Sequence, residues 1–207
     1  MNADYLKTWS AALTVANRRQ IYENCYLQAI VKSYVAILHT SGTENEIRDR
    51  LYWHLRTRNA ITKDLVDKGI LNITFEHWEA VSEEEKSRVD LTFFMSGYFR
   101  FDVECKRLGS RWSDNQPYLS DGIGRFVESK YALESDHGAM IGFLISGDID
   151  TVFEMLNSKV AEFQQCKVKR DIQTPINSDW QHSFISHHLR KDGRNIQLYH
   201  LLLPFLN

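Results

Sequence analysis

The sequence predicts an α/β fold in which helices flank a mixed central β-sheet. Strand-like runs rich in β-branched and aromatic residues alternate along the chain with amphipathic helical stretches. Residues 139–146 are apolar at nearly every position, which is typical of a strand covered on both faces. With 207 residues, of which 43% are hydrophobic, the chain has the size and composition of one domain with a large core.

We expect this single domain to occupy residues 1–207 and to have three parts. Helices fill about 17–68, a core that carries the candidate chemistry spans about 44–146, and a helix followed by a β-hairpin fills about 149–207. The predicted order is two main helices, three strands, a helix, a strand, a helix and two strands.

The N-terminal part is predicted to be helical. Between residues 17 and about 40, apolar side chains recur at spacings of three and four, and Ser41-Gly42 ends the pattern. Thr43 followed by Glu46 has the form of a capping box for a second helix, from 44 to about 58. A short helix near 62–68 ends at Gly69, and a strand follows at 71–79.

Two β-rich runs, 89–95 and 99–105, are separated by Ser96-Gly97-Tyr98 and predict a hairpin. If Gly97 is its centre, residues whose numbers sum to 194 lie opposite each other, so Asp90 opposes Glu104. One face is then wholly apolar and is predicted to be core: Val89, Leu91, Phe93, Met95, Phe101, Val103 and Cys105. The polar face carries Asp90, Thr92, Arg100, Asp102, Glu104 and Lys106.

The pairing of Asp90 with Glu104 points to a metal site. Facing carboxylates repel each other, and a divalent cation such as Mg²⁺ removes the conflict. The neighbouring Lys106 can orient or deprotonate a water, or stabilise charge on a phosphate under attack. The alternative is an ordinary solvated strand face on which Lys106 only balances charge.

The later segments complete the predicted sheet. After a loop that contains Arg111, Trp112 and Pro117, we expect a helix at 120–134, the buried strand at 139–146 and a helix at 149–165. A terminal hairpin pairs 182–189 with 195–203, and a turn at Asp192-Gly193 sets His187 opposite Leu198. We interpret the histidines of this hairpin as core or half-buried residues rather than metal ligands: His182, His187, His188 and His200.

Charge and apolar content exclude several functions. With 25 Lys and Arg against 27 Asp and Glu, the chain does not bind nucleic acid through bulk positive charge. Any such contact needs a local basic face or a basic partner. The candidates for a basic face are Arg107, Arg111, Arg125 and Lys130, although an ordinary solvated surface is the alternative. The longest apolar stretches are far shorter than a bilayer requires and no signal peptide is recognised, so we expect a cytoplasmic protein without membrane contact.

Asp90, followed after thirteen residues by Glu104-Cys105-Lys106 on hairpin strands, resembles the PD-(D/E)xK nuclease superfamily. Many restriction endonucleases, Holliday-junction resolvases and recombination exonucleases belong to it. The resemblance covers about residues 44–146 and includes the leading helix, the hairpin, the next helix and the buried strand. It implies a restriction-endonuclease-like fold. Two departures are Val89, where proline often precedes the aspartate, and the lack of glutamine in the 120–134 helix.

The resemblance also implies roles for individual residues. Asp90 and Glu104 would bind Mg²⁺, for which Mn²⁺ can substitute, and Lys106 would be the catalytic lysine. Glu46 would match the extra acidic residue that many members carry on the leading helix, with Glu44 and Asp49 as rivals for that place.

The resulting expectation is a Mg²⁺-dependent endonuclease that hydrolyses phosphodiester bonds, with DNA as the preferred substrate, in bacterial restriction or anti-phage defence. RNA or a nucleotide is the other substrate class considered. The alternative function is a non-catalytic nucleic-acid-binding or regulatory subunit that retains the nuclease fold. A homodimer or a partner protein of a defence system is the expected assembly.

Overall fold

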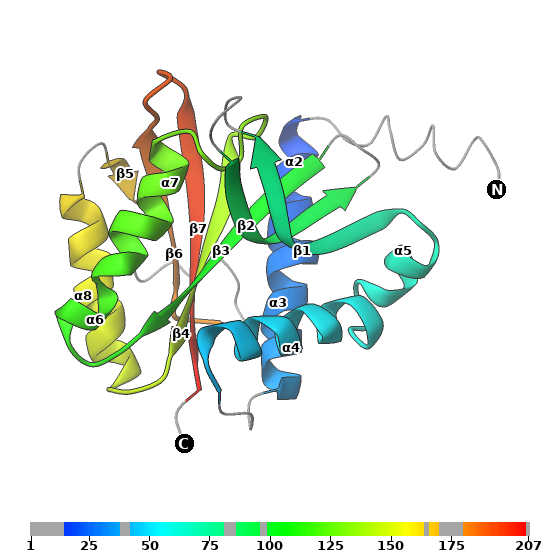
Figure 1. Ribbon diagram of the computed structural model, residues 1–207, viewed down its shortest axis with the longest axis horizontal. Coiled ribbons are helices and arrows are strands. Elements are labelled where there is room, and N and C mark those ends of the chain that lie inside the picture. Colours follow the sequence, from blue (N-terminus) through cyan, green and yellow to red (C-terminus); the bar gives the residue numbers. More distant parts are fainter. Residues whose placement is uncertain are drawn as a thin grey trace.

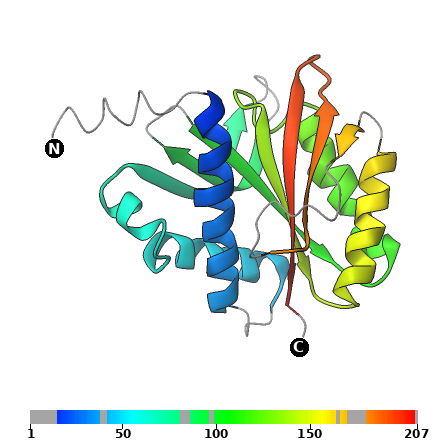
Figure 2. The same ribbon diagram turned by 180° about the vertical axis from the view of Figure 1, so that it is seen from behind.

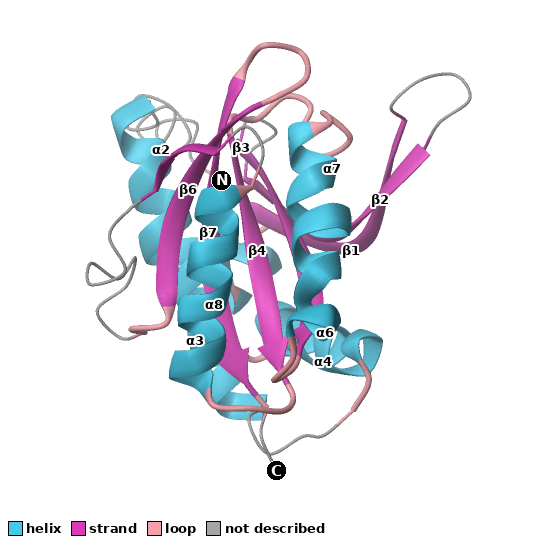
Figure 3. Ribbon diagram, turned by 90° about the vertical axis from the view of Figure 1, so that its left-hand side faces the viewer, coloured by secondary structure: helices cyan, strands magenta, loops and turns pink. Residues whose placement is uncertain are grey.

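The computed structural model describes residues 15–37, 42–80, 86–95, 99–163, 166–169 and 180–205. A seven-stranded mixed β-sheet lies between two sets of helices (Figure 1). The helical segments α2 to α3 run along one face (Figure 2), and α6, α7 and α8 cover the other (Figure 3). The α/β class with a mixed, helix-flanked sheet is therefore confirmed.

The N-terminal helix is continuous, as its apolar spacing predicts, although it widens in the middle. It consists of α2 (Val15–Ile21), the π-helical segment η1 (Tyr22–Leu27) and α3 (Gln28–Ile37). In η1, the ring of Tyr22 stacks on Phe101 with centroids 4.6 Å apart, and Tyr26 stacks on Phe93 at 4.7 Å. These aromatic contacts fasten the helix to the sheet.

Helix α4 (Glu44–Thr57) begins at the capping box that the sequence predicts. The Glu46 backbone N–H donates to Thr43 Oγ1, and the Glu46 carboxylate accepts from the Thr43 backbone N–H at 2.8 Å. The short helix α5 (Lys63–Asp67) follows, and Gly69 ends it with φ of 67°, a conformation that glycine adopts at little cost.

The strands are arranged in the order β1-β2-β3-β4-β7-β6-β5. Strands β3, β4 and β7 are parallel at the centre, and the remaining neighbours pair antiparallel. The bounds are β1 Leu71–Ala80, β2 Lys86–Met95, β3 Phe99–Leu108, β4 His137–Leu144, β5 Cys166–Lys169, β6 Ser183–Leu189 and β7 Asn195–Pro204. The short β5 is one strand more than the sequence predicts, and the hairpin turn at 96–98 lies outside the described residues.

Each face of the sheet has its own apolar cluster. Leu91, Phe93, Met95, Phe101, Val103 and Cys105 pack with the N-terminal helices and α4, as predicted. Val89 is also buried, but it belongs to the cluster under α7 and α8, so its assignment to the first face is wrong. In a regular strand Val89 and Leu91 would point to the same face, so their burial in different clusters indicates that β2 is distorted at Asp90.

The helix predicted at 120–134 begins and ends earlier. It runs through α6 (Trp112–Pro117), the π-helical η2 (Tyr118–Ile123) and α7 (Gly124–Val127). Proline lacks a backbone donor and predicts a break, but here the adjoining π-helical turns accommodate Pro117. The chain leaves the helix after Val127, and the buried carboxylate of Asp102 accepts from the backbone N–H of Ala132 at 2.9 Å.

The terminal part contains α8 (Ile149–Glu162), capped by Asp148, and the hairpin of β6 and β7. The predicted hairpin register is wrong by one residue, because His187 pairs with Gln197 and His200 with Phe184. The turn is longer than a two-residue loop, since the Arg190 N–H donates to the Arg194 carbonyl at 2.8 Å. His188 and His200 are fully buried and share Ser186 Oγ as a partner, which confirms their interpretation as core residues.

Candidate active site

The candidate site lies where β2 separates from β3. The predicted register, with residue numbers that sum to 194, is confirmed from Met95–Phe99 to Leu91–Val103. The described pairing ends there. Beyond it, Asp90 Oδ2 accepts from the backbone N–H of Cys105 at 2.8 Å, so a side chain replaces the neighbouring strand as hydrogen-bond partner of β3.

A second carboxylate binds β3 one step further along the same edge. Glu44, at the start of α4, accepts from the backbone N–H of Arg107 through Oε2 at 2.7 Å. Asp90 and Glu44 therefore accept from two residues of β3 that are two positions apart, Cys105 and Arg107. Glu104 precedes Cys105 on this strand, and Lys106 lies between Cys105 and Arg107. Two acidic side chains from different elements thus converge on the Glu104–Lys106 segment.

Glu104 is the most buried acid of this group. Its side chain is 3% exposed, Oε1 forms an ion pair with Lys106 Nζ, and Oε2 is buried without a hydrogen-bond partner among the described residues. Burial, followed by repulsion from Asp90, raises the Glu104 pKa to about 8. Burial alone would lower the pKa of Lys106, but the Glu104 carboxylate raises it above its ordinary value. Lys106 therefore stays charged while Glu104 is poised to exchange a proton near neutral pH.

The second oxygen of Asp90 is occupied by a residue that sequence reasoning missed. Arg48 Nη1 donates to Asp90 Oδ1 at 2.9 Å, and the Arg48 side chain is 3% exposed. Its Nη2 also binds Asp49 and Glu76, each at 3.0 Å. A sequence signal existed, because position 48 falls on the same helical stripe as the buried Leu51 and Leu55. A charged residue on such a stripe needs buried partners.

Glu76 is the other residue that sequence reasoning missed, and no sequence signal marks it. The β1–β2 register places it opposite Asp90, but the ladder passes from Phe75–Leu91 directly to His77–Val89. Glu76 has φ of 49°, a left-handed conformation that costs a non-glycine residue energy. The distortion of both strands at one level brings the carboxylates of Glu76 and Asp90 onto the same guanidinium.

The predicted third acid, Glu46, does not join the pair. Its exposed carboxylate accepts from the N–H and hydroxyl of Thr43, which lowers its pKa, and it serves the helix cap. Among its two rivals, Glu44 reaches β3 and Asp49 binds Arg48. The acid of α4 that lies beside Lys106 is thus Glu44.

The four predicted phosphate-binding residues divide into two places. Arg107 and Arg111 line a surface hollow of about 400 Å³ at the end of β3, together with Leu108, Gly109, Asp114, Ile145 and Ser146. Arg125 bonds to the hydroxyl of Tyr131 and lies within electrostatic range of Glu104. Lys130 forms an ion pair with Glu128 at 3.1 Å.

No protein-family model matches this chain, and neither a curated protein nor a solved structure shows detectable similarity to it.

The side chains at the site meet some of the requirements of a metal-binding site but not all of them. The described part of the chain holds no group of three or more His, Cys, Asp or Glu side chains gathered closely enough for a metal ion. Glu104 Oε2, however, is buried without a hydrogen-bond partner among the described residues and within electrostatic range of Asp90, and buried oxygens of this kind are normally satisfied. The donor set of two carboxylates is of the hard oxygen type that Mg²⁺ prefers.

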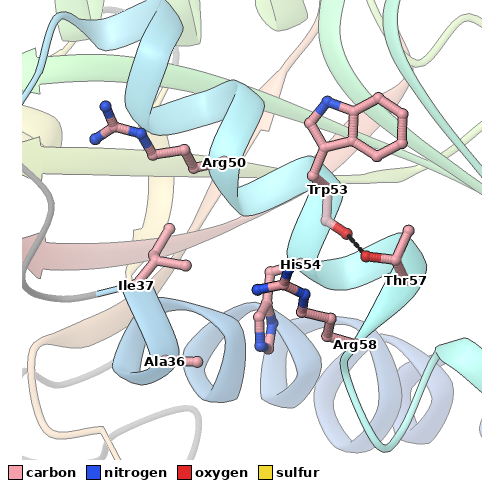
Figure 4. A pocket seen from close by; sticks show the side chains of 7 residues that line it. All are labelled: Ala36, Ile37, Arg50, Trp53, His54, Thr57 and Arg58. Atoms are coloured by element: carbon pink, nitrogen blue, oxygen red, sulfur yellow. Dashed lines mark hydrogen bonds between the residues drawn. The ribbon is translucent and has the colours of Figure 1, made fainter.

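A separate hollow of about 460 Å³ lies between α3 and α4 (Figure 4). Its lining includes Arg50, Trp53, His54 and Arg58, and none of the predicted site residues.

None of the helices in the described ranges combines the length and apolar composition needed to cross a bilayer.

Proposed function

We propose that this protein is a Mg²⁺-dependent endonuclease of the PD-(D/E)xK type that hydrolyses phosphodiester bonds in DNA, in a restriction or anti-phage setting. The observation that carries the proposal is the buried, unpartnered Oε2 of Glu104, a carboxylate that is repelled by Asp90 and whose other oxygen, Oε1, is ion-paired to Lys106. The order of elements from α4 to β4, with the carboxylates where β2 leaves β3, supports the restriction-endonuclease-like fold.

Each residue has a defined role in this proposal. Asp90 and Glu104 would hold Mg²⁺, with Glu44 as an additional acidic group, and Mn²⁺ would substitute. When bound, Mg²⁺ would stabilise the negative charge that develops on the attacked phosphate. Lys106 Nζ, ion-paired with Glu104 and charged, would orient the attacking water and stabilise negative charge on the attacked phosphate. Arg125, near Glu104, and the Arg107–Arg111 hollow contact neighbouring phosphates.

The test is cleavage of circular plasmid, linear duplex, single-stranded DNA and RNA with Mg²⁺, Mn²⁺ or EDTA. Nicking or linearisation of the closed circle with Mg²⁺ and its loss in EDTA are expected, and the other substrates establish the preferred nucleic acid. Lys106→Ala should abolish cleavage. Lys63→Ala, which removes a lysine from an exposed ion pair on α5, is the matched control and should cleave like the parent. A parent protein inactive on every substrate and metal would overturn the proposal.

A second function, a non-catalytic nucleic-acid-binding or regulatory subunit, is favoured by a different observation. Asp90 is paired with Arg48, and Glu104 with Lys106, so the protein's own cations already neutralise both carboxylates. On this account the pairs are structural, and the protein binds nucleic acid without metal-dependent cleavage. Binding that EDTA leaves unchanged, together with inactivity, would select this function.

A further inference from the structure

Trp78 on β1 is the most exposed large apolar side chain in the described part of the molecule, at 62%. Its cross-strand partner is Arg88, whose guanidinium lies over the indole ring, 5.8 Å from the centroid. A guanidinium over an indole is a favourable cation–π contact that holds both side chains in place. The pair therefore presents a largely exposed indole with a positive charge over one of its faces.

This pair is coupled to the candidate active site through direct contacts. Arg88 Nη1 lies 3.3 Å from Glu76 Oε1, and the same Glu76 oxygen accepts from Arg48, which binds Asp90. On the other side, the Arg88 carbonyl accepts from the Tyr131 hydroxyl at 2.7 Å. The chain of contacts from Trp78 to Asp90 fixes the position of the indole relative to the carboxylates.

The spacing suits a nucleic-acid strand. Arg88 and Asp90 are two residues apart on β2, which corresponds to about 7 Å along an extended strand. One strand of stacked nucleic acid advances about 3.4 Å per nucleotide, so the backbone position of Arg88, the cross-strand partner of Trp78, lies within about two nucleotides of Asp90. Figure 3 shows that the β1–β2 ribbon projects away from the rest of the sheet.

We propose that Trp78 and Arg88 form a stacking platform for an unpaired base, so that the substrate is single-stranded nucleic acid or a strand with an unpaired segment next to the cleaved bond. The inference rests on the proposed nuclease function and specifies its substrate class. An exposed indole offers a face that any base can stack on, whereas a base inside a duplex has both faces covered. With a net charge of −2, the protein gains little affinity from bulk attraction to phosphates, and stacking supplies binding energy that does not depend on it.

The platform is tested by binding in EDTA, where cleavage does not interfere. Labelled oligothymidine, the same oligomer with abasic sites, and a duplex of equal length are titrated by fluorescence anisotropy. Trp78→Ala should weaken binding of the normal single strand at least about five-fold, and Trp78→Phe should restore most of it, because stacking is worth about 1–3 kcal/mol per base. Duplex affinity should not change. Trp53→Ala is the matched control, since that indole is 58% exposed but lines the hollow between α3 and α4 (Figure 4).

The abasic oligomer keeps the test decisive if Trp78→Ala does not fold. The parent should bind abasic and normal strands with clearly different affinities, and equal affinities would overturn the platform. Equal losses on single strand and duplex in Trp78→Ala would also overturn it, because the indole would then not distinguish unpaired bases from paired ones. Failure of the proposed function is distinguishable: Trp78-dependent binding of single strands without cleavage removes the nuclease and leaves the platform standing. Plasmid cleavage by the parent, together with single-strand binding that Trp78→Ala leaves unchanged, removes the platform and leaves the nuclease standing.

Discussion

Arg48 and Asp90 form a buried ion pair, with Nη1 and Oδ1 2.9 Å apart, that joins α4 to the point where β2 leaves β3. Arg48 is almost inaccessible to solvent, so its charge depends on the carboxylates around it. The pair gives Asp90 a structural role in addition to any chemical one, and this changes the expected effect of replacing it.

Asp90→Asn should lower the free energy of unfolding by about 1–3 kcal/mol. Loss of one partner from a buried ion pair costs about 3–5 kcal/mol, and Arg48 retains the partly exposed Asp49 and Glu76, so the effect should stay below that range. Urea unfolding measures it. Asp67→Asn, in an exposed pair with Lys63, is the control and should change stability little. If both variants were equally stable, the Arg48–Asp90 pair would contribute nothing.

The pH dependence of stability should carry the signature of Glu104. Its pKa is about 8 in the folded protein against an ordinary value of 4.5, so between these values the folded state binds the proton and the unfolded chain does not. The free energy of unfolding should therefore fall as the pH rises from 5 to 8. In EDTA, the melting temperature of the parent relative to Glu104→Gln should decrease over this range. A constant difference would mean that Glu104 titrates normally.

Mg²⁺ or Mn²⁺ should raise the melting temperature of the parent, because a ligand selective for the folded state stabilises it. The rise should vanish in Glu104→Gln and decrease in Glu44→Gln. Glu46→Gln provides the matched control on the same helix turn: its carboxylate serves the Thr43 cap, so the metal shift should remain complete. Ca²⁺ should also stabilise the parent but support little cleavage, since its coordination is looser. A metal shift that survives in Glu104→Gln would contradict the site.

The apolar face of the hairpin offers a prediction about folding alone. Val103 is fully buried, and Val103→Asp would place an unpaired charge in the core, so the variant should be insoluble or lack a cooperative melt. Val103→Ala removes volume without adding charge and should fold with reduced stability. Circular dichroism during heating compares the two. A cooperative melt of Val103→Asp would show that the face is not core.

The sequence predicts the parts of the site that depend on local pattern. Two-residue alternation and a central glycine predict that Asp90, Glu104 and Lys106 share the polar face of a hairpin, and the described pairs follow that register as far as Leu91–Val103. The capping box between Thr43 and Glu46 is equally local and is also confirmed. That same box explains why Glu46 is a poor candidate for a ligand, because its carboxylate already has partners three residues away.

What the sequence does not predict depends on contacts between distant segments. Arg48 and Asp90 are 42 positions apart, and only packing of α4 against the sheet brings them together. The separation of β2 from β3 and the left-handed Glu76 have no compositional signal. In the terminal hairpin, a turn one residue longer than assumed is enough to shift His187 from Leu198 to Gln197. The segment around Pro117, predicted as a loop, is helical from Trp112 on, because local propensity does not include the tolerance of an adjoining π-helical turn.

The kink at Glu76 has a consequence for the protein in concentrated solution. Strand β1 ends the sheet on one side and is ten residues long, and a straight edge of that length is a template for pairing with another copy. At Glu76 the backbone turns out of the extended conformation, which divides the edge into two short stretches. Glu76, whose carboxylate binds Arg48, therefore also interrupts the strand edge along which copies of the protein would pair and aggregate.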